Sequence, residues 1–485
     1  MNAMGAAPFV ADLVISGGTV VSGEASIAAD VAIAGEHIVA VGRPEAMPPA
    51  RERLEARGLL VLPGAIDVHV HFREPGYTHK EDWATGSAAA AMGGVTTVFE
   101  MPNTNPPTRS AAELAEKRAL AAKSSVDFGL YGLLAEDNLD ELEGLIAAGA
   151  NAFKCFMGNT FGDLPAPSTG AMLEGFEIIA RTGLRISLHA EEATIMARRQ
   201  ARLAAAGRND PLDHLLARPA VVAVEAVGRA ATLAEWTGAR IHILHISSAA
   251  ELRPLAEAKA RGVDVTGETC PCYLLLSRED YGRLGPLIRV NPPVREAYDR
   301  DALWHALRSG VIDMIATDHA PHTPEEKARL PIWRADCGFP GVETQMPLML
   351  TEVARGRLTI EQYVRLAAEA PAKAFGLWPT KGRIAPGAHA DIAIVDPKRT
   401  ETIRAADLHS RAKVTPFDGV TVTGVPVHTL VRGRLVQRDR RFVSDSSGWG
   451  RPVTEIQRMP TPVLRNADLA IDRLAPRLPL ARSAA

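Results

Sequence analysis

The sequence predicts an α/β protein built as a (β/α)₈ barrel, with a small β-sandwich domain formed by the N- and C-terminal segments. Three observations indicate this fold. Short apolar strands alternate with amphipathic helices through the middle of the chain, β-rich segments flank that region on both sides, and 485 residues exceed the length of one typical domain. A doubly wound parallel sheet is the alternative for the central region.

The β-rich segments lie at the two ends of the pattern. From Asp12 to about Leu62, β-branched runs are broken by turns, as in LVISGGTVVSG, ADVAIAGEHIVAVG and GLLVLPG. The same texture returns in ADIAIVDP and VTVTGVPVHTLVRGRLV. We therefore expect residues 1–64 and 379–443 to share one sandwich.

Between these segments, residues 65–378 carry the expected barrel. Its strands and following helices are VTTVFEM with AAELAEKRALAAK, AFKCFM with GAMLEGFEIIARTG, RISLHAE, IHILHIS with AAELRPLAEAKARG, and DMIATDHA. Residues 444–485 have scattered Pro and Arg and weak patterning. They are expected to form a C-terminal extension that packs on the surface or on a partner subunit, or else a disordered tail.

Composition narrows the class of protein. Lysine and arginine number 54 against 57 acidic residues, so the net charge is −3 and we expect no nucleic-acid partner. Four scattered cysteines are too few for a disulfide framework, which favours a reducing cytoplasm. The first residues lack a basic region, and no uncharged run is long enough for a bilayer, so neither a signal peptide nor a membrane span is expected.

The first concentrated chemical signal is AIDVHVHFREPG, which contains His69 and His71. Because side chains alternate along a strand, the two imidazoles lie on one face, about 7 Å apart, and can bind one metal. Downstream, each expected strand end supplies another ligand-type residue: Lys154, His189, His245 and Asp318. In a barrel, these residues would converge on the C-terminal face.

The motifs then point to a family. The segments DVHVHFREPG, GGVTT, MPNTNPP, FKCFM, LHAEE, LHIS, ETCP, NPPVR and ATDHAPHTPEEK resemble the dihydroorotases within the cyclic amidohydrolases. The resemblance spans roughly Asp12 to Val436. It implies reversible hydrolysis of the cyclic amide of L-dihydroorotate to N-carbamoyl-L-aspartate, a step of pyrimidine biosynthesis.

The resemblance also implies a binuclear metal centre. His69, His71 and Asp318 would bind one divalent ion, His189 and His245 the other, and an N-carboxylated Lys154 would bridge them. Zinc is the expected metal, although nitrogen and oxygen ligands also admit manganese or cobalt. A hydroxide shared by the two ions would attack the amide, with Asp318 as the catalytic residue that carries the proton to the leaving nitrogen.

Substrate contacts follow from the same resemblance. Arg73, Asn103 and His322 would surround the substrate carboxylate, and a guanidinium suits a carboxylate through a bidentate pair. Asn291 and the backbone at Cys337 and Gly338 would hold the amide and carbonyl groups of the ring.

Two segments near this site depart from the pattern or match it only briefly. Dihydroorotases typically read ETCPHH, whereas this chain has ETCPCY, with Cys272 and Tyr273 in place of the histidines. The segment MGNTFGDL resembles their mobile loop, in which Thr160 could touch the substrate.

Two alternatives stay open at this point. One is a hydrolase of another cyclic ureide or imide, namely a hydantoinase, dihydropyrimidinase or allantoinase. Arg73 argues against it, because a buried guanidinium without an anionic partner is costly. The other is a non-catalytic scaffolding relative, although the six ligand-type residues are all present. For an enzyme, the expected partners are a small cyclic amide and further copies of the chain, as a dimer or tetramer.

Overall fold

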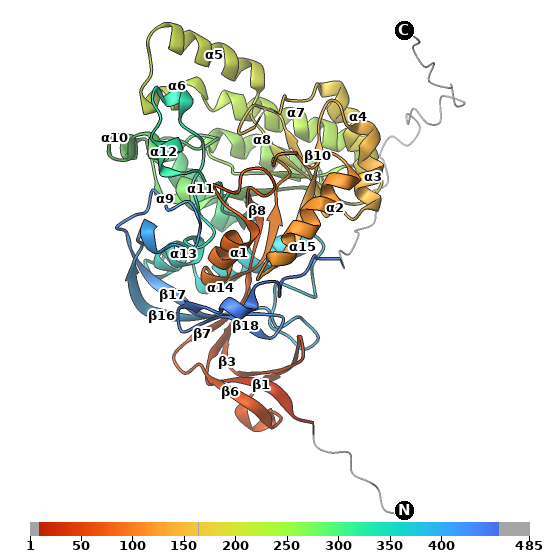
Figure 1. Cartoon of the computed structure of the whole chain (residues 1–485), viewed down its shortest axis with the longest axis vertical. Coiled ribbons are helices and arrows are strands. Elements are labelled where there is room, and N and C mark those ends of the chain that lie inside the picture. The colour runs from red at the N-terminus through yellow and green to blue at the C-terminus, as the bar shows by residue number, and fades with distance from the viewer. Residues whose placement is uncertain (1–8, 163, 455–485) are drawn as a thin grey trace, which may run out of the picture.

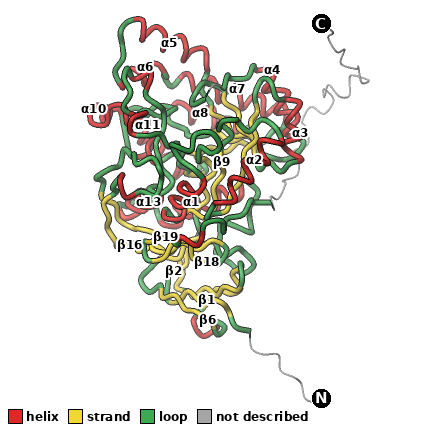
Figure 2. Tube along the Cα trace, in the orientation of Figure 1, coloured by secondary structure: helices red, strands yellow, loops and turns green. Residues whose placement is uncertain are grey.

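The computed structural model describes residues 9–162 and 164–454. A barrel of parallel strands with surrounding helices forms the larger part, and two sheets form a smaller part beneath it (Figure 1). The expected fold class is therefore confirmed. The tube drawing shows strands concentrated in the barrel centre and in the lower sheets (Figure 2).

Eight parallel strands make the barrel, and they neighbour one another in sequence order. They are β8 (Ala65–Val70), β9 (Val95–Glu100), β10 (Asp127–Leu134), β11 (Ala152–Phe156), β12 (Arg185–His189), β13 (Arg240–Ile243), β14 (Val265–Thr269) and β15 (Met314–Ile315). The last strand returns to the first, because Val70 forms a parallel bridge with His319 and His71 N donates to His319 O over 2.8 Å. This closure rules out the doubly wound alternative.

Helices connect the barrel strands and cover the outside. They are α1 (Trp83–Met92), α2 (Ala111–Leu120), α3 (Leu142–Ala147), α4 (Thr169–Ala180), α5 (Ala193–Ala205), α6 (Pro211–Ala217), α7 (Val221–Thr237), α8 (Ala249–Ala260), α9 (Pro271–Leu275), α10 (Tyr281–Leu284), α11 (Ala297–Ser309), α12 (Pro324–Lys327), α13 (Gln345–Ala354), α14 (Ile360–Val364) and α15 (Ala370–Ala374). Several begin with a capping box, such as Ser110 with Glu113 at α2, which satisfies otherwise unpaired backbone N–H groups. Among the described residues, no helix is long and apolar enough to cross a membrane.

The smaller part has two sheets. A four-stranded sheet has the order β5 (His37–Gly42), β4 (Asp30–Ala34), β1 (Ala11–Ser16), β6 (Ala50–Glu55). A seven-stranded sheet has the order β19 (Arg441–Phe442), β18 (Arg434–Arg438), β17 (Thr421–Val431), β16 (Ile392–Thr402), β7 (Leu60–Pro63), β2 (Thr19–Val21), β3 (Ser26–Ala28). β7 and β16 pair antiparallel, so the two ends of the chain share a sheet.

An apolar core joins the two sheets, with Ile15, Val31, Ile392, Ile394 and Leu430 among its buried members. Burial of this surface stabilises the pairing of segments that lie far apart in the sequence.

Of the expected C-terminal extension, residues 455–485 lie outside the described residues. Its first part runs along the N-terminal end of the barrel: Gly450 N donates to Ser124 O, Phe128 N to Arg451 O, and Val453 N to Phe128 O. The described beginning of the extension is therefore packed on the barrel.

Candidate metal centre

The structure brings the six predicted ligands together at the C-terminal end of the barrel strands. His69 lies on β8, Lys154 on β11, and His189 ends β12, whereas His71, His245 and Asp318 follow β8, β13 and β15 closely. The side chains of His69, Lys154, His189 and His245 are all at most 2% exposed. This convergence follows from the barrel, because parallel strands end at one rim.

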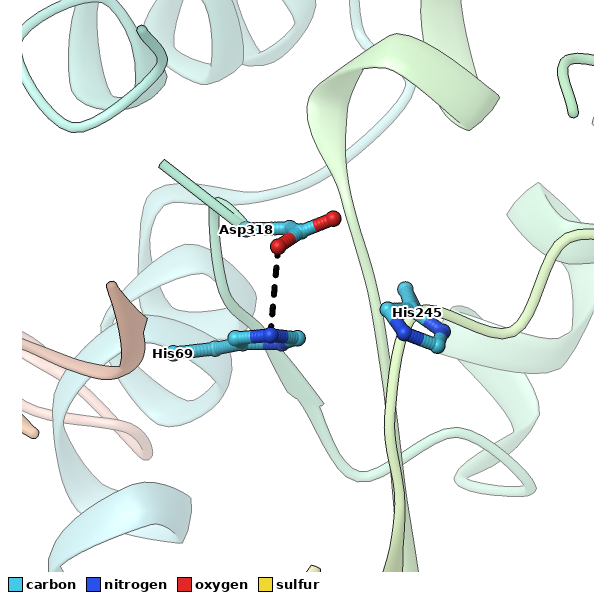
Figure 3. A group of neighbouring side chains, drawn as sticks. All are labelled: His69, His245 and Asp318. Atoms are coloured by element: carbon cyan, nitrogen blue, oxygen red, sulfur yellow. Dashed lines mark ion pairs between the residues drawn. The ribbon is translucent and has the colours of Figure 1, made fainter. Parts of the chain in front are cut away.

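Two imidazoles meet the carboxylate of Asp318 at the same oxygen. The Nε2 atoms of His69 and His71 each lie 3.1 Å from Asp318 Oδ1. Ligand-type atoms of His69, His245 and Asp318 also lie within 4.8 Å of one another. In Figure 3 the three side chains surround a common space, with His245 facing the other two.

The outer nitrogens of the first two histidines have partners of their own. His69 Nδ1 lies 2.7 Å from Glu268 Oε1, and His71 Nδ1 lies 2.8 Å from Asn103 Oδ1. When these Nδ1 atoms carry the protons, both Nε2 lone pairs face the Asp318 oxygen. Three acceptors then crowd together, an arrangement that a cation between them would stabilise.

The second half of the cluster is built around His189. Its Nδ1 lies 2.9 Å from His245 Nε2, and its Nε2 lies 2.9 Å from Glu191 Oε2, which also contacts Arg218. The Arg218 guanidinium and His189 outweigh burial and hold the pKa of Glu191 at about 2. His189 is therefore oriented by a permanent carboxylate.

Burial also sets the charge state of the cluster. It lowers the pKa values of His69, His71, His189 and His245, which favours neutral imidazoles with a free lone pair. It raises the pKa values of Asp318 and Glu268, so additional positive charge would stabilise their ionised forms. The donor set fits divalent metal ions.

Lys154 is buried against an aromatic ring, with Nζ 4.6 Å from the centre of Phe156. Burial lowers its pKa, although Asp318 and Glu268 oppose the effect. A lowered pKa increases the fraction of neutral amine, which is the form that captures carbon dioxide. The environment of Lys154 thus fits the predicted carbamate.

Three residues of the site have left-handed backbone. The φ angles are 64° at Arg73, 38° at His245 and 46° at Asp318. Such angles are uncommon for residues other than glycine and cost on the order of 1–3 kcal/mol each. The local strain is concentrated where side chains must turn into the barrel mouth.

The residues predicted to hold a substrate carboxylate already have protein partners. Arg73 Nε donates to Pro321 O over 3.2 Å, and its Nη2 lies 3.1 Å from His322 Nε2. His322 Nδ1 lies 2.9 Å from Lys80 Nζ and 3.2 Å from Asp336 Oδ2. Both ring nitrogens of His322 are therefore engaged. Of the guanidinium nitrogens of Arg73, Nη1 is buried and has no hydrogen-bond partner within the described part of the chain.

An aromatic side chain covers this group. Phe161, on the loop after β11, lies with its ring 4.5 Å from the Arg73 guanidinium carbon and 4.4 Å from Lys80 Nζ. Its ring centre is 4.9 Å from that of His322. The neighbouring Thr160, which the sequence placed near the substrate, accepts a hydrogen bond from Phe161 N.

The other predicted contacts lie at the same end of the barrel. Asn291 lies beside His214 and Arg218. Gly338 N donates to Arg289 O over 2.9 Å, and a Cβ on Gly338 would lie 2.5 Å from that of Ala320. Gly338 has a φ of 120°, so both space and backbone angle require glycine there. Cys337, next to it, is partly exposed.

The two residues that depart from the dihydroorotase pattern have packing roles. Cys272 is buried, and Tyr273 OH donates to Pro292 O over 2.7 Å, which ties α9 to the NPPVR segment.

Sequence reasoning missed four residues that shape the site: Glu268, Glu191, His242 and Phe161. Glu268 stands in ETCP and Glu191 in LHAEE, so both belong to motifs already noted. Their position at strand ends was a usable signal. Phe161 lies in MGNTFGDL, a segment already noted for Thr160, but its contact with Arg73 depends on the conformation of the loop.

Comparisons with known proteins agree with this site. A model of the amidohydrolase family matches residues 60–436. The chain is 41% identical to an allantoinase of Rubrobacter xylanophilus, over 90% of this chain and 96% of the relative. It is 39% identical to a dihydroorotase of Methanothermobacter thermautotrophicus, over 80% and 87%.

Among solved structures, an L-hydantoinase (dihydropyrimidinase) from Arthrobacter aurescens matches with a TM-score of 0.89 and 35% identity, over 92% of this chain and 100% of that one. The comparisons favour the hydantoinase and allantoinase alternative over the dihydroorotase that the motifs first indicated. The chain belongs to the amidohydrolase family, as a metal-dependent hydrolase that acts on cyclic amides.

Proposed function

We propose that the protein hydrolyses the ring amide of an uncharged cyclic ureide, with allantoin as the first candidate and hydantoin as the second. The proposal is supported by relatives named allantoinase and hydantoinase, which match over about nine-tenths of the chain. In this reaction water adds to a ring carbonyl, the C–N bond breaks, and the nitrogen leaves with a proton. The product is an open-chain ureido acid.

One observation carries the choice of an uncharged ring. The three side chains predicted to bind a substrate carboxylate all bond to protein groups: Arg73 to Pro321 and His322, His322 to Asp336, and Asn103 to His71. A carboxylate would have to displace Pro321 and Asp336 to reach the donors of Arg73 and His322, whereas Asn103 uses only its Oδ1, as the acceptor from His71 Nδ1. A neutral carbonyl needs a single N–H donor, which Arg73 Nη1 can supply.

This arrangement also removes the argument that Arg73 requires an acidic substrate. The guanidinium is buried, but it has a backbone acceptor, an imidazole and the Phe161 ring around it. Its burial is therefore compensated without a substrate anion.

The metal ligands of the proposal are those of the sequence prediction. His69, His71 and Asp318 would hold one divalent ion, His189 and His245 the second, and carboxylated Lys154 would bridge them. When bound, the two ions supply a Lewis acid for the carbonyl group and favour ionisation of water at neutral pH. We propose zinc as the metal.

Asp318 is the residue that moves the proton. Its Oδ1 lies 3.1 Å from the Nε2 atoms of two imidazoles of the cluster. A carboxylate within hydrogen-bond reach of both the attacking water and the leaving nitrogen can take the proton from the first and donate it to the second.

A substrate panel tests the proposal. The purified protein, supplied with zinc and bicarbonate, is offered allantoin, hydantoin, dihydrouracil and L-dihydroorotate under identical conditions. We expect kcat/KM for allantoin or hydantoin to exceed that for dihydroorotate at least tenfold. A higher efficiency with dihydroorotate, lost selectively in Arg73→Met, would overturn the proposal and restore the dihydroorotase interpretation.

A further inference from the structure

Glu268 lies fully buried on β14, below the six predicted ligands, and contacts two of them. Its Oε1 lies 2.7 Å from His69 Nδ1 and accepts from the backbone N of His245 over 3.3 Å. Its Oε2 lies 3.0 Å from His242 Nε2. One carboxylate thus touches a histidine of each proposed metal position.

We propose that Glu268, held in place by His242, is a positioning residue that orients one ligand of each metal position and so couples the two ions. The inference rests on the proposed ligand set and adds to it a residue that touches neither metal nor substrate.

The first effect of Glu268 is on the tautomer of His69. Because Glu268 accepts a hydrogen bond from Nδ1, the proton of the neutral imidazole is on Nδ1 and Nε2 keeps its lone pair. Nε2 faces the site and lies 3.1 Å from Asp318 Oδ1. A carboxylate behind an imidazole also increases the basicity of the opposite nitrogen. The Nδ1 atom of His71 instead contacts the neutral amide of Asn103. His69 and His71 therefore differ in whether the partner of Nδ1 is a carboxylate or a neutral amide.

The second effect is on the backbone of His245. This residue has a φ of 38°, a backbone angle that is uncommon for residues other than glycine. The hydrogen bond from its N–H to Glu268 favours the strained conformation. In that conformation the His245 ring lies 2.9 Å from His189 Nδ1 and faces the cluster.

His242 fixes the carboxylate from the other side. It is completely buried, and its Nδ1 lies 2.8 Å from the Thr266 hydroxyl. When Thr266 donates to Nδ1, the proton of His242 is on Nε2 and is donated to Glu268. Hydrogen bonds then connect Thr266 to His242, His242 to Glu268, and Glu268 to His69, with one donor and one acceptor at each contact.

The experiment measures metal retention. Wild type, Glu268→Gln and a matched buried-carboxylate control, Glu352→Gln, are loaded with zinc and dialysed against increasing concentrations of a weak chelator. Glu352 is buried on α13 and pairs with Arg355 and Arg357, away from the cluster. Zinc per chain is measured by elemental analysis, and folding by circular dichroism and thermal melting.

We expect Glu268→Gln to lose both ions in parallel at about 10- to 100-fold lower chelator concentration than wild type. Glu352→Gln should retain zinc as wild type does. If Glu268→Gln fails to fold, His242→Asn, which keeps the carboxylate but removes its anchor, should show a smaller loss in the same direction. Cobalt-loaded Glu268→Gln should also show an altered visible absorption spectrum.

The inference would be overturned if folded Glu268→Gln retained zinc as well as wild type does. If Glu268→Gln does not fold, the same result in His242→Asn would overturn it. Loss of one ion alone would overturn the coupling of the two positions. The proposed ligand set fails separately, if the wild-type protein binds no zinc at all.

Discussion

The two ends of the barrel each hold a mostly buried group of residues of metal-ligand type, but the two groups differ in how their charge is compensated. At the C-terminal end, His69, His245 and Asp318 lie close together, with Lys154 nearby. At the N-terminal end, Asp127, His389 and Asp391 form a similar group. There, Lys381 Nζ lies 2.7 Å from Asp127 and 2.5 Å from Asp391.

The difference lies in the lysines. Asp127 and Asp391 overcome burial and raise the pKa of Lys381, which is therefore a permanent ammonium between two carboxylates. Arg432 Nε adds two contacts of 3.1 Å to Asp127. Burial instead lowers the pKa of Lys154. Ligand-type residues that lie close together do not by themselves define a metal site. A metal ion is needed only where no cationic side chain of the protein already compensates the charge of the carboxylates.

Asp318→Asn should give the largest effect on catalysis. The amide cannot carry the proton, so we expect kcat to fall by about 10²–10⁴-fold. The measurement is steady-state hydrolysis of allantoin or hydantoin by zinc-loaded protein, alongside circular dichroism. Retention of more than a tenth of the activity would assign proton transfer to another group.

Lys154→Ala should lose most of its activity, by about two orders of magnitude, together with at least one metal ion. Because a carbamate is an anionic oxygen ligand, a small acid such as acetate is expected to restore part of both. Elemental analysis and activity are measured with and without acetate. Two tightly held ions in a fully active variant would show that Lys154 does not bridge them.

Lys381→Met tests the opposite end. Removing the ammonium leaves two buried carboxylates with less compensation, and we expect the free energy of unfolding to fall by about 3–5 kcal/mol. Metal content and kcat per folded molecule should stay near wild type, because Lys381 lies far from the ligands at the other barrel end. Urea unfolding and elemental analysis check this pair of outcomes. If Lys381→Met lost zinc but kept its free energy of unfolding, the metal site would lie at the N-terminal end of the barrel and not at the C-terminal end.

The group around Asp127 and Lys381 should also make the free energy of unfolding depend on pH, with a smaller effect. Burial raises the pKa of Asp127, but Lys381 and Arg432 outweigh it and lower the value below its usual 3.8. A lowered carboxyl pKa stabilises the folded state above the unfolded-state pKa, and this contribution is lost as pH falls through the folded-state value. The unfolding free energy should therefore decrease below about pH 4.

The same pH series on Lys381→Met isolates the contribution of the ion pair. Its acid limb should be shallower than that of wild type, since the lysine no longer lowers the Asp127 pKa. Parallel limbs in the two proteins would assign the acid sensitivity to other carboxylates.

The sequence was informative where a local pattern maps onto a strand end. Alternating strands and helices predicted the barrel, and His69, Lys154, His189, His245 and Asp318 were found because barrel strands end at one rim. The substrate was harder, because DVHVHF, LHAEE and TDHAPH describe a metal centre that the family shares. Arg73 suggested an acidic substrate, but its partners Pro321, His322 and Phe161 depend on contacts that only the fold creates.

Zinc content of the wild-type protein is the most direct test of the account. After loading with zinc and bicarbonate and removal of free metal, we predict two zinc ions per chain, with loss of cyclic-ureide hydrolysis on exhaustive chelation and recovery on adding zinc back. The same assay on Lys381→Met should again give two ions. Full hydrolysis by metal-free protein, or zinc lost from Lys381→Met but kept by Lys154→Ala, would contradict the assignment of the metal centre to the C-terminal end of the barrel.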